Sequence, residues 1–146
     1  MLRSKSGIAV FIILNAFIPL LIGILIYLTS RNRTVLYDIF CRIGIRLNTV
    51  DQPSFLRNYG CDFCWAYSLF WITLGWGLIC RWNNAALAAG LITFPFAAAV
   101  EFLQIPSSFP GHFDLFDIIV EFSAIGISAL MAVWAEKKGA VYEKSH

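Results

Sequence analysis

Acidic and amide side chains gather between two apolar runs, from Glu101 to Glu121, in the sequence EFLQIPSSFPGHFDLFDIIVE. Glu101 and Gln104 are three residues apart, so they share one face of a helix. Asp114, Asp117 and Glu121 are spaced three and four apart, which places them in a single stripe on the next helix. Carboxylates spaced in this way can bind a cation or move a proton between them.

A turn separates the two polar groups, because Pro106, Pro110 and Gly111 lie between them and interrupt a helix. The sequence therefore predicts a helical hairpin that brings the two polar stripes face to face.

Three interpretations of this acidic cluster stay open. In the first, the stripe lines a polar pocket that binds a lipid headgroup or performs acid–base chemistry, with one carboxyl protonated and another ionised. In the second, the carboxylates hold Mg²⁺ or Ca²⁺, with His112 at the rim. In the third, Asp114 caps the fourth helix, Asp117 interacts with the helix dipole, and polar side chains hydrogen-bond across helices.

The third interpretation pairs Glu101 with Gln104, but it explains Glu121 badly. Glu121 lies about 12 Å beyond the start of its helix at 1.5 Å per residue. An ionised carboxylate at that depth costs a few kcal/mol unless it is paired, hydrated or protonated. We therefore expect a functional pocket, with no metal and no cofactor assigned.

Catalytic motifs do not assign a reaction to this chain. The sequence contains no G-x-S-x-G elbow, no H-E-x-x-H helix and no phosphate-binding glycine loop. His112 and His146 are its two histidines, which disfavours a serine triad. The catalytic residues, if the chain is an enzyme, stay unassigned.

Composition indicates an integral membrane protein. Of the 146 residues, 59% are hydrophobic and 14% are charged, whereas soluble domains carry about 25% charged residues. The mean hydropathy is +0.72. A net charge of +2 is too small to indicate nucleic acid as a partner.

Apolar runs predict an all-α, polytopic membrane protein in one domain, with four transmembrane helices over residues 8–28, 61–80, 85–105 and 113–134. Each run is long enough to cross a hydrocarbon core of roughly 30 Å. The first run is longer than the core of a signal peptide and ends at a polar border, so we interpret it as an uncleaved span. Within it, Asn15 is expected to hydrogen-bond to a neighbouring helix, and Pro19 to kink the chain.

Residues 31–59 form the longest polar connection. Their apolar residues recur at helical spacing, which predicts an amphipathic interfacial helix after the first span. A helix packed against the other spans is the alternative.

Positive charges slightly favour cytoplasmic termini. An even number of spans puts six basic residues on the side of the termini: Arg3, Lys5, Arg81, Lys137, Lys138 and Lys144. Five lie opposite: Arg31, Arg33, Arg42, Arg46 and Arg57. The second and fourth spans then both begin on the side opposite the termini, which places Asp62 near the acidic hairpin.

Cys61 and Cys64 form a single C-x-x-C, which without a second pair is a weak zinc signal. We interpret them as small hydrophobic residues at the membrane interface or in helix packing.

Two motifs resemble the VanZ-like membrane proteins, a family named after a protein associated with teicoplanin resistance. The hairpin motif is Glu101-x-x-Gln104, a Pro/Gly turn and Asp114-x-x-Asp117-Ile118-Ile119. The motif at the second span is Asp62-x-x-Trp65-Ala66-Tyr67-Ser68. The chain departs from the family pattern in the turn, which lacks an arginine, and at Glu121, where the family often has asparagine.

The resemblance implies a bacterial inner-membrane protein that acts at the cell envelope, binds an envelope lipid or lipid-linked precursor, and is linked to glycopeptide antibiotic resistance. Its expected partners are membrane lipids, together with a second copy or a partner membrane protein. The alternative is a non-enzymatic membrane subunit that assembles with partner transmembrane proteins. The candidate pocket residues are Asp62, Glu101, Gln104, His112, Asp114, Asp117 and Glu121.

Overall fold

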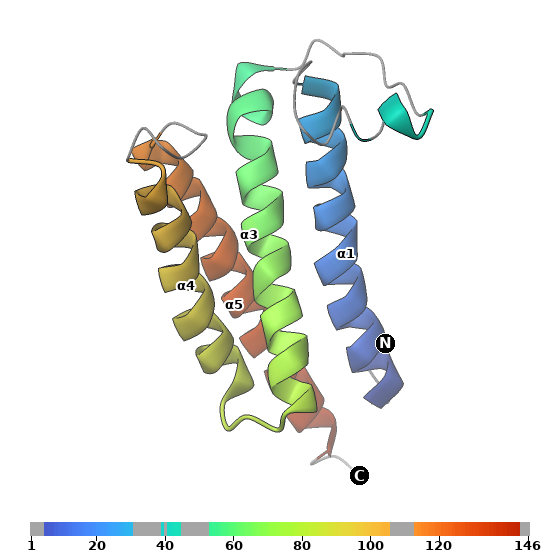
Figure 1. Ribbon diagram of the computed structural model, residues 1–146. Helices are drawn as coiled ribbons and strands as arrows, with labels where there is room; N and C mark the ends of the chain where they lie inside the picture. The colour runs from blue at the N-terminus through green and yellow to red at the C-terminus, as the bar shows by residue number, and fades with distance from the viewer. Residues whose placement is uncertain (1–4, 31–38, 40, 45–52, 106–112, 144–146) are drawn as a thin grey trace.

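The computed structural model describes residues 5–30, 39, 41–44, 53–105 and 113–143 of the chain. Four long helices make up most of this part: α1 (Lys5–Ser30), α3 (Ser54–Ile79), α4 (Ala85–Leu103) and α5 (Leu115–Glu143). They run alternately up and down, so that the start of α1 and the end of α5 lie at the same end of the bundle (Figure 1). The predicted all-α class is confirmed.

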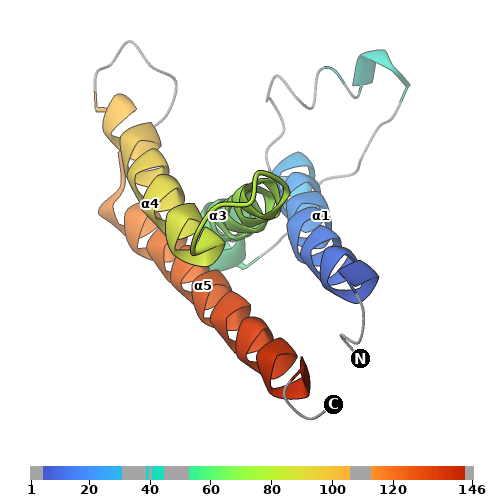
Figure 2. The same ribbon diagram turned by 90° about the horizontal axis from the view of Figure 1, so that it is seen from below.

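Helix α3 lies at the centre of the bundle. It packs against α1 on one side and against α4 and α5 on the other, and α4 and α5 also pack on each other (Figures 1 and 2). Since α1 packs mainly on α3, most of its outward surface is uncovered by the described helices.

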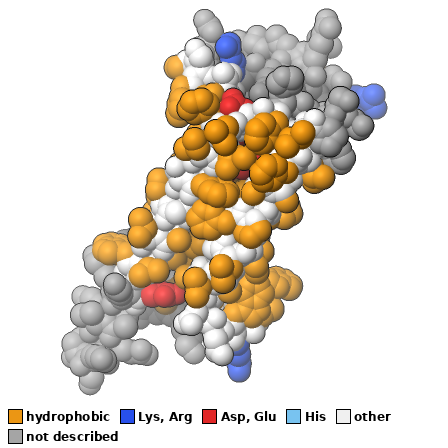
Figure 3. Space-filling view, turned by 90° about the vertical axis from the view of Figure 1, so that its left-hand side faces the viewer, with side chains coloured by type: hydrophobic (Ala, Val, Ile, Leu, Met, Phe, Trp, Pro, Cys, Tyr) orange, Lys and Arg blue, Asp and Glu red, His pale blue; other side chains and the backbone are white. Residues whose placement is uncertain are grey.

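Three of the helices are long and apolar enough to cross a membrane, over Gly7–Thr29, Ala85–Leu103 and Leu115–Glu136. The side of the bundle formed by α4 and α5 is mostly hydrophobic at its surface, as Figure 3 shows. Helix α3 is also 26 residues long, but its first turns carry Arg57, Asn58 and Asp62. Polar residues of the first turns, together with Trp, Tyr, Ser, Thr and Gly residues along its length, lower its mean hydropathy, and α3 is not among the three.

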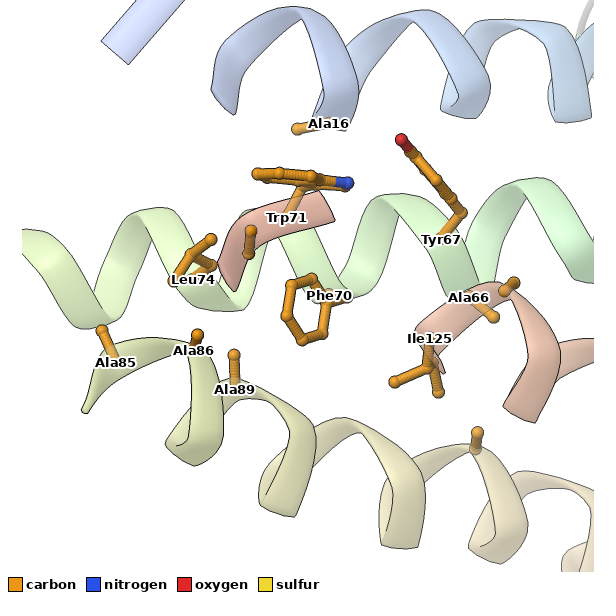
Figure 4. Packing of buried hydrophobic residues seen from close by; sticks show 13 residues of the cluster. Ala16, Ala66, Tyr67, Phe70, Trp71, Leu74, Ala85, Ala86, Ala89 and Ile125 are labelled. Carbon is orange, nitrogen blue, oxygen red and sulfur yellow. The ribbon is translucent and has the colours of Figure 1, made fainter. Parts of the chain in front are cut away.

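Aromatic residues of α3 fill the space between the helices. Trp71 lies beneath Ala16 of α1, whereas Phe70 points to the opposite side, toward α4 and α5 (Figure 4). The two rings meet edge to face, with centroids 5.9 Å apart. Small residues accommodate these rings on the neighbouring helices: Ala85, Ala86, Ala89, Ala97, Ala124 and Ala132 are all buried.

Helices α1 and α3 approach each other closely at Gly23. A Cβ atom added at Gly23 would lie 2.9 Å from the Cβ of Cys64, closer than real contacts allow. Close approach over small residues is how helices associate where lipid supplies no hydrophobic driving force. Cys64 therefore has a packing role, as the sequence predicts.

The connection between α3 and α4 begins with a Schellman turn. The amide of Trp82 donates to the Gly77 carbonyl at 2.9 Å, and the amide of Arg81 donates to the Leu78 carbonyl at 3.2 Å. Arg81 adopts a left-handed conformation, with φ of 56°. The Trp82 ring folds back onto Gly77, where an added Cβ would lie 2.7 Å from it.

Two boundaries differ from those predicted from the sequence. Helix α3 begins at Ser54, so residues 54–59 of the expected loop are its first turns, and α5 continues to Glu143 rather than ending near residue 134. The polar segment Ser54–Tyr59 lies before the span predicted from the apolar run, yet it forms one continuous helix with it. The interfacial helix stays a prediction, because most of residues 31–52 lie outside the described part of the chain.

Candidate functional site

Glu121 is fully buried in the second turn of α5. Neither of its carboxyl oxygens has a hydrogen-bond partner among the described residues. A buried carboxyl without partners loses its hydration with nothing in exchange, so such a group needs an explanation beyond packing.

Glu101 lies in the last turn of α4 and is 3% exposed. Its Oε1 accepts a 3.0 Å hydrogen bond from Nε2 of Gln104. The prediction that this pair bonds across helices is wrong, because the bond runs along the end of α4. The other oxygen, Oε2, is buried and has no partner within the described chain.

The bundle brings acids from three helices together at this end. Glu101 of α4, Asp62 of α3 and Asp117 of α5 all lie within electrostatic range of the Glu121 carboxyl. Asp62 and Asp117 are half-buried, whereas Glu101 and Glu121 are closed off from the outside. We call Asp62, Glu101, Asp117 and Glu121 the acid cluster.

Asp114 has a structural role at the start of α5. Its Oδ1 accepts a 2.9 Å hydrogen bond from the amide of Phe116, which is an N-cap interaction and confirms the predicted cap.

The hydroxyl of Tyr59, on α3, interacts with the same Asp114 carboxylate. Burial, followed by the charges of Asp114 and Asp117 and the hydrogen bond to Asp114, raises the pKa of Tyr59 above its usual value.

Two aromatic residues of α3 border the acids and were not among the residues predicted from the sequence. The indole of Trp65 lies beside the Glu121 carboxyl, without hydrogen-bond geometry to either oxygen. Tyr59 lies beside Asp114, and its ring is 6.4 Å from that of Phe116. Both residues are three positions from Asp62 along α3, so helical spacing from that acid would have indicated them.

The described residues contain no group of three or more His, Cys, Asp or Glu side chains arranged to hold a metal ion. His112 lies outside the described residues, so its predicted place at the rim stays a prediction. Within the described part of the chain, the acid cluster offers carboxyl oxygens that can accept hydrogen bonds and attract a positive charge.

A separate apolar groove lies at the other end of the α1–α3 interface. Its volume is about 560 Å³, and its lining includes Ile12, Phe17, Trp71, Trp76 and Trp82. None of the acids lines it, so the groove and the acid cluster are different features.

Comparison with protein-family models, curated proteins and solved structures finds no match for this chain.

Proposed function

We propose that this chain is a four-span protein of the bacterial inner membrane that binds the headgroup of an envelope lipid or lipid-linked precursor in the acid cluster. The observation that carries the proposal is Glu121, a fully buried carboxyl with two unpartnered oxygens at the meeting point of three helices. Buried acids in membrane-spanning helices generally mark functional sites.

Helix α3 is the fourth span in this proposal. Its 26 residues correspond to about 39 Å at 1.5 Å per residue, enough to cross a hydrocarbon core of roughly 30 Å. Its lower hydropathy is compatible with spanning, because α1, α4 and α5 cover much of its surface. The termini are cytoplasmic in this proposal, so the acid cluster lies near the outer headgroups.

The VanZ-like resemblance belongs to the same proposal. Its motif acids Glu101 and Asp117 come together with Asp62 around Glu121, although they are distant in sequence. That assembly is what a shared binding pocket requires. In this proposal the pocket acts at the cell envelope and affects glycopeptide susceptibility.

Glu121→Gln tests the pocket, with Glu136→Gln as the matched control, because Glu136 is an exposed acid near the other end of α5. Native mass spectrometry of the purified chain should show bound lipid in the wild type and the control, and loss of lipid in the Glu121 variant. Cells expressing the same variants should differ in teicoplanin susceptibility in the same order. Equal lipid retention and equal susceptibility in all three, at equal expression, would refute the proposal.

The second candidate function is a membrane subunit that assembles with partner transmembrane proteins. The observation that favours it is the uncovered outer face of α1, together with the apolar groove between α1 and α3. Purification in a mild detergent separates the two candidates. A partner of fixed stoichiometry that is lost on enlarging an exposed groove side chain, as in Ile13→Trp, supports the subunit and not the lipid-binding pocket.

A further inference from the structure

We infer that the acid cluster recognises an ammonium group, either in a lipid headgroup or in a free amine. The inference rests on the proposed function, because it names the chemical class that the same site accepts. Its basis is that the described charged groups acting on Glu121 are all acids, and that three buried carboxyl oxygens of Glu101 and Glu121 have no hydrogen-bond partner among the described residues.

Among the described residues, the charged groups that act on the Glu121 carboxyl are all acids: Glu101, Asp62 and Asp117. Between residues 58 and 136, Arg81 is the one Lys or Arg in the chain, and it lies at the other end of α3, in the turn to α4. Two further described arginines, Arg42 and Arg57, are both exposed. In the part of the chain that the structure describes, neither Glu101 Oε2 nor the Glu121 carboxyl has a partner at hydrogen-bond geometry, although the Trp65 indole lies beside Glu121 and the Asp114 backbone lies beside Glu101. A cation that enters the site would pair with these carboxyl oxygens.

An ammonium group matches these oxygens in number and in charge. It carries three N–H donors and one positive charge, and the cluster contains three buried carboxyl oxygens without partners: Glu101 Oε2, Glu121 Oε1 and Glu121 Oε2. Hydrogen bonds between an ammonium donor and a carboxylate are charge-assisted, and they are about twice as strong as neutral ones. A phosphate would instead add negative charge to a site that already holds four acids, which disfavours binding through that group.

Two further features of the site favour an organic cation: aromatic rings beside the acids, and a path from the headgroup region to them. Trp65 lies beside Glu121 and Tyr59 beside Asp114, and such rings attract cations through their faces. A divalent metal ion would need several oxygens in one shell, and no such group is formed by the described side chains. Asp114 and Asp117 are half-exposed at the start of α5, one to two turns before Glu121, so an amine can reach the buried acids from the headgroup region.

The test uses the full chain in phospholipid nanodiscs that differ in headgroup: phosphatidylglycerol alone, or the same lipid with phosphatidylethanolamine or phosphatidylcholine added. Native mass spectrometry and tryptophan fluorescence report binding, and free ethanolamine serves as the soluble competitor. We expect phosphatidylethanolamine to bind at least about tenfold more tightly than phosphatidylglycerol, and more tightly than phosphatidylcholine, which has no N–H donor. Glu121→Gln and, separately, Glu101→Gln should remove this preference, whereas Glu136→Gln should keep it.

Each outcome tests the ammonium inference, the proposed function, or both. A preference for phosphatidylethanolamine that free ethanolamine abolishes identifies an aminolipid as the ligand. Binding of free ethanolamine without any preference among lipids identifies a soluble amine, and the ammonium inference holds. Equal binding of phosphatidylglycerol and phosphatidylethanolamine that depends on Glu121, with no binding of free ethanolamine, overturns the inference but not the proposed function. Absence of both lipid and amine binding overturns both. The comparison of lipids on the wild-type chain holds even if a variant fails to fold.

Discussion

The Tyr67 hydroxyl of α3 donates a 2.6 Å hydrogen bond to Oδ1 of Asn15 on α1. The Asn15 amide group donates in turn to the Phe11 carbonyl at 2.8 Å, and the Met131 sulfur of α5 lies 3.3 Å from the Tyr67 oxygen. The bond confirms the interhelical role predicted for Asn15. It is a polar link between α1, which packs mainly on α3, and the rest of the bundle.

Tyr67→Phe should weaken the association of α1 with α3. Interhelical hydrogen bonds in membranes contribute about 0.6 kcal/mol on average and reach about 1.7 kcal/mol, so we expect a loss of stability in that range. Unfolding in mixed detergent micelles would measure it, in a double-mutant cycle with Asn15→Ala. Strictly additive effects of the two substitutions would show that the bond contributes nothing.

Gly23→Ala should destabilise the same interface through overpacking. The new Cβ would lie 2.9 Å from the Cβ of Cys64, and overpacking costs about 1–3 kcal/mol. Gly126→Ala is the control, since no side chain or neighbouring backbone lies within 4 Å of a Cβ added there. That change should be neutral or stabilising by up to about 1 kcal/mol, through helix propensity. Equal thermal stability of the two variants would contradict the close contact of α1 and α3.

Glu121→Met should make the protein more stable while it removes ligand binding. The substitution replaces an unpartnered buried carboxyl with an apolar side chain of similar length, which should stabilise by about 1–3 kcal/mol. The control Glu136→Met changes an exposed acid on the same helix and should change stability by less than about 0.5 kcal/mol. Chemical unfolding of both variants without added amine would measure the difference. A Glu121 variant less stable than wild type would show that this carboxyl has a partner in the folded protein.

Arg81→Gly should stabilise the turn between α3 and α4. A non-glycine residue in the left-handed region costs roughly 1–2 kcal/mol, and Arg81 has φ of 56°. The matched control is Cys80→Gly, since Cys80 has φ of −78° and gains nothing from glycine. Thermal unfolding should rank the variants with Arg81→Gly above wild type and Cys80→Gly below it. The opposite ranking would contradict the Schellman geometry.

The Tyr59 phenol should lose its proton at a higher pH than the phenol of an ordinary tyrosine. The pKa of Tyr59 is raised in the folded state by burial and by Asp114 and Asp117. The neutral phenol is therefore favoured, and its contribution to stability is complete below the unfolded pKa near 10. It is lost as pH rises through the higher folded value. The ultraviolet titration curve of Tyr59 is obtained by subtracting the curve of Tyr59→Phe from that of the wild type. Asp114→Asn should lower the midpoint of this difference curve. A midpoint that this substitution leaves unchanged would rule out the contact.

Local spacing predicted the features that belong to one helix or to its end. The N-cap of Asp114 follows from an acid placed just before an apolar run. The helical class follows from long apolar runs without strand periodicity, and Asn15 stood out as the polar side chain in the middle of the first. Each of these depends on residues a few positions apart, for which helix geometry sets the distances.

Packing decided the features that join residues distant in sequence. Trp65 comes beside Glu121 because α3 lies at the centre and presents that side of itself to α5. The orientation of one helix against another depends on small residues such as Gly23 and on the rings that fill the gaps, which a one-dimensional pattern does not specify.

The sequence by itself determined that apolar helices form and that acids lie on both arms of one hairpin, beside its turn. The sequence also predicted that these acids would come together, whereas only the tertiary structure decided how they pack: Glu101 and Glu121 are buried, and three of their carboxyl oxygens have no partner among the described residues. The physical reason is that helix formation depends on hydrogen bonds within one segment, whereas the meeting of side chains depends on how several segments pack.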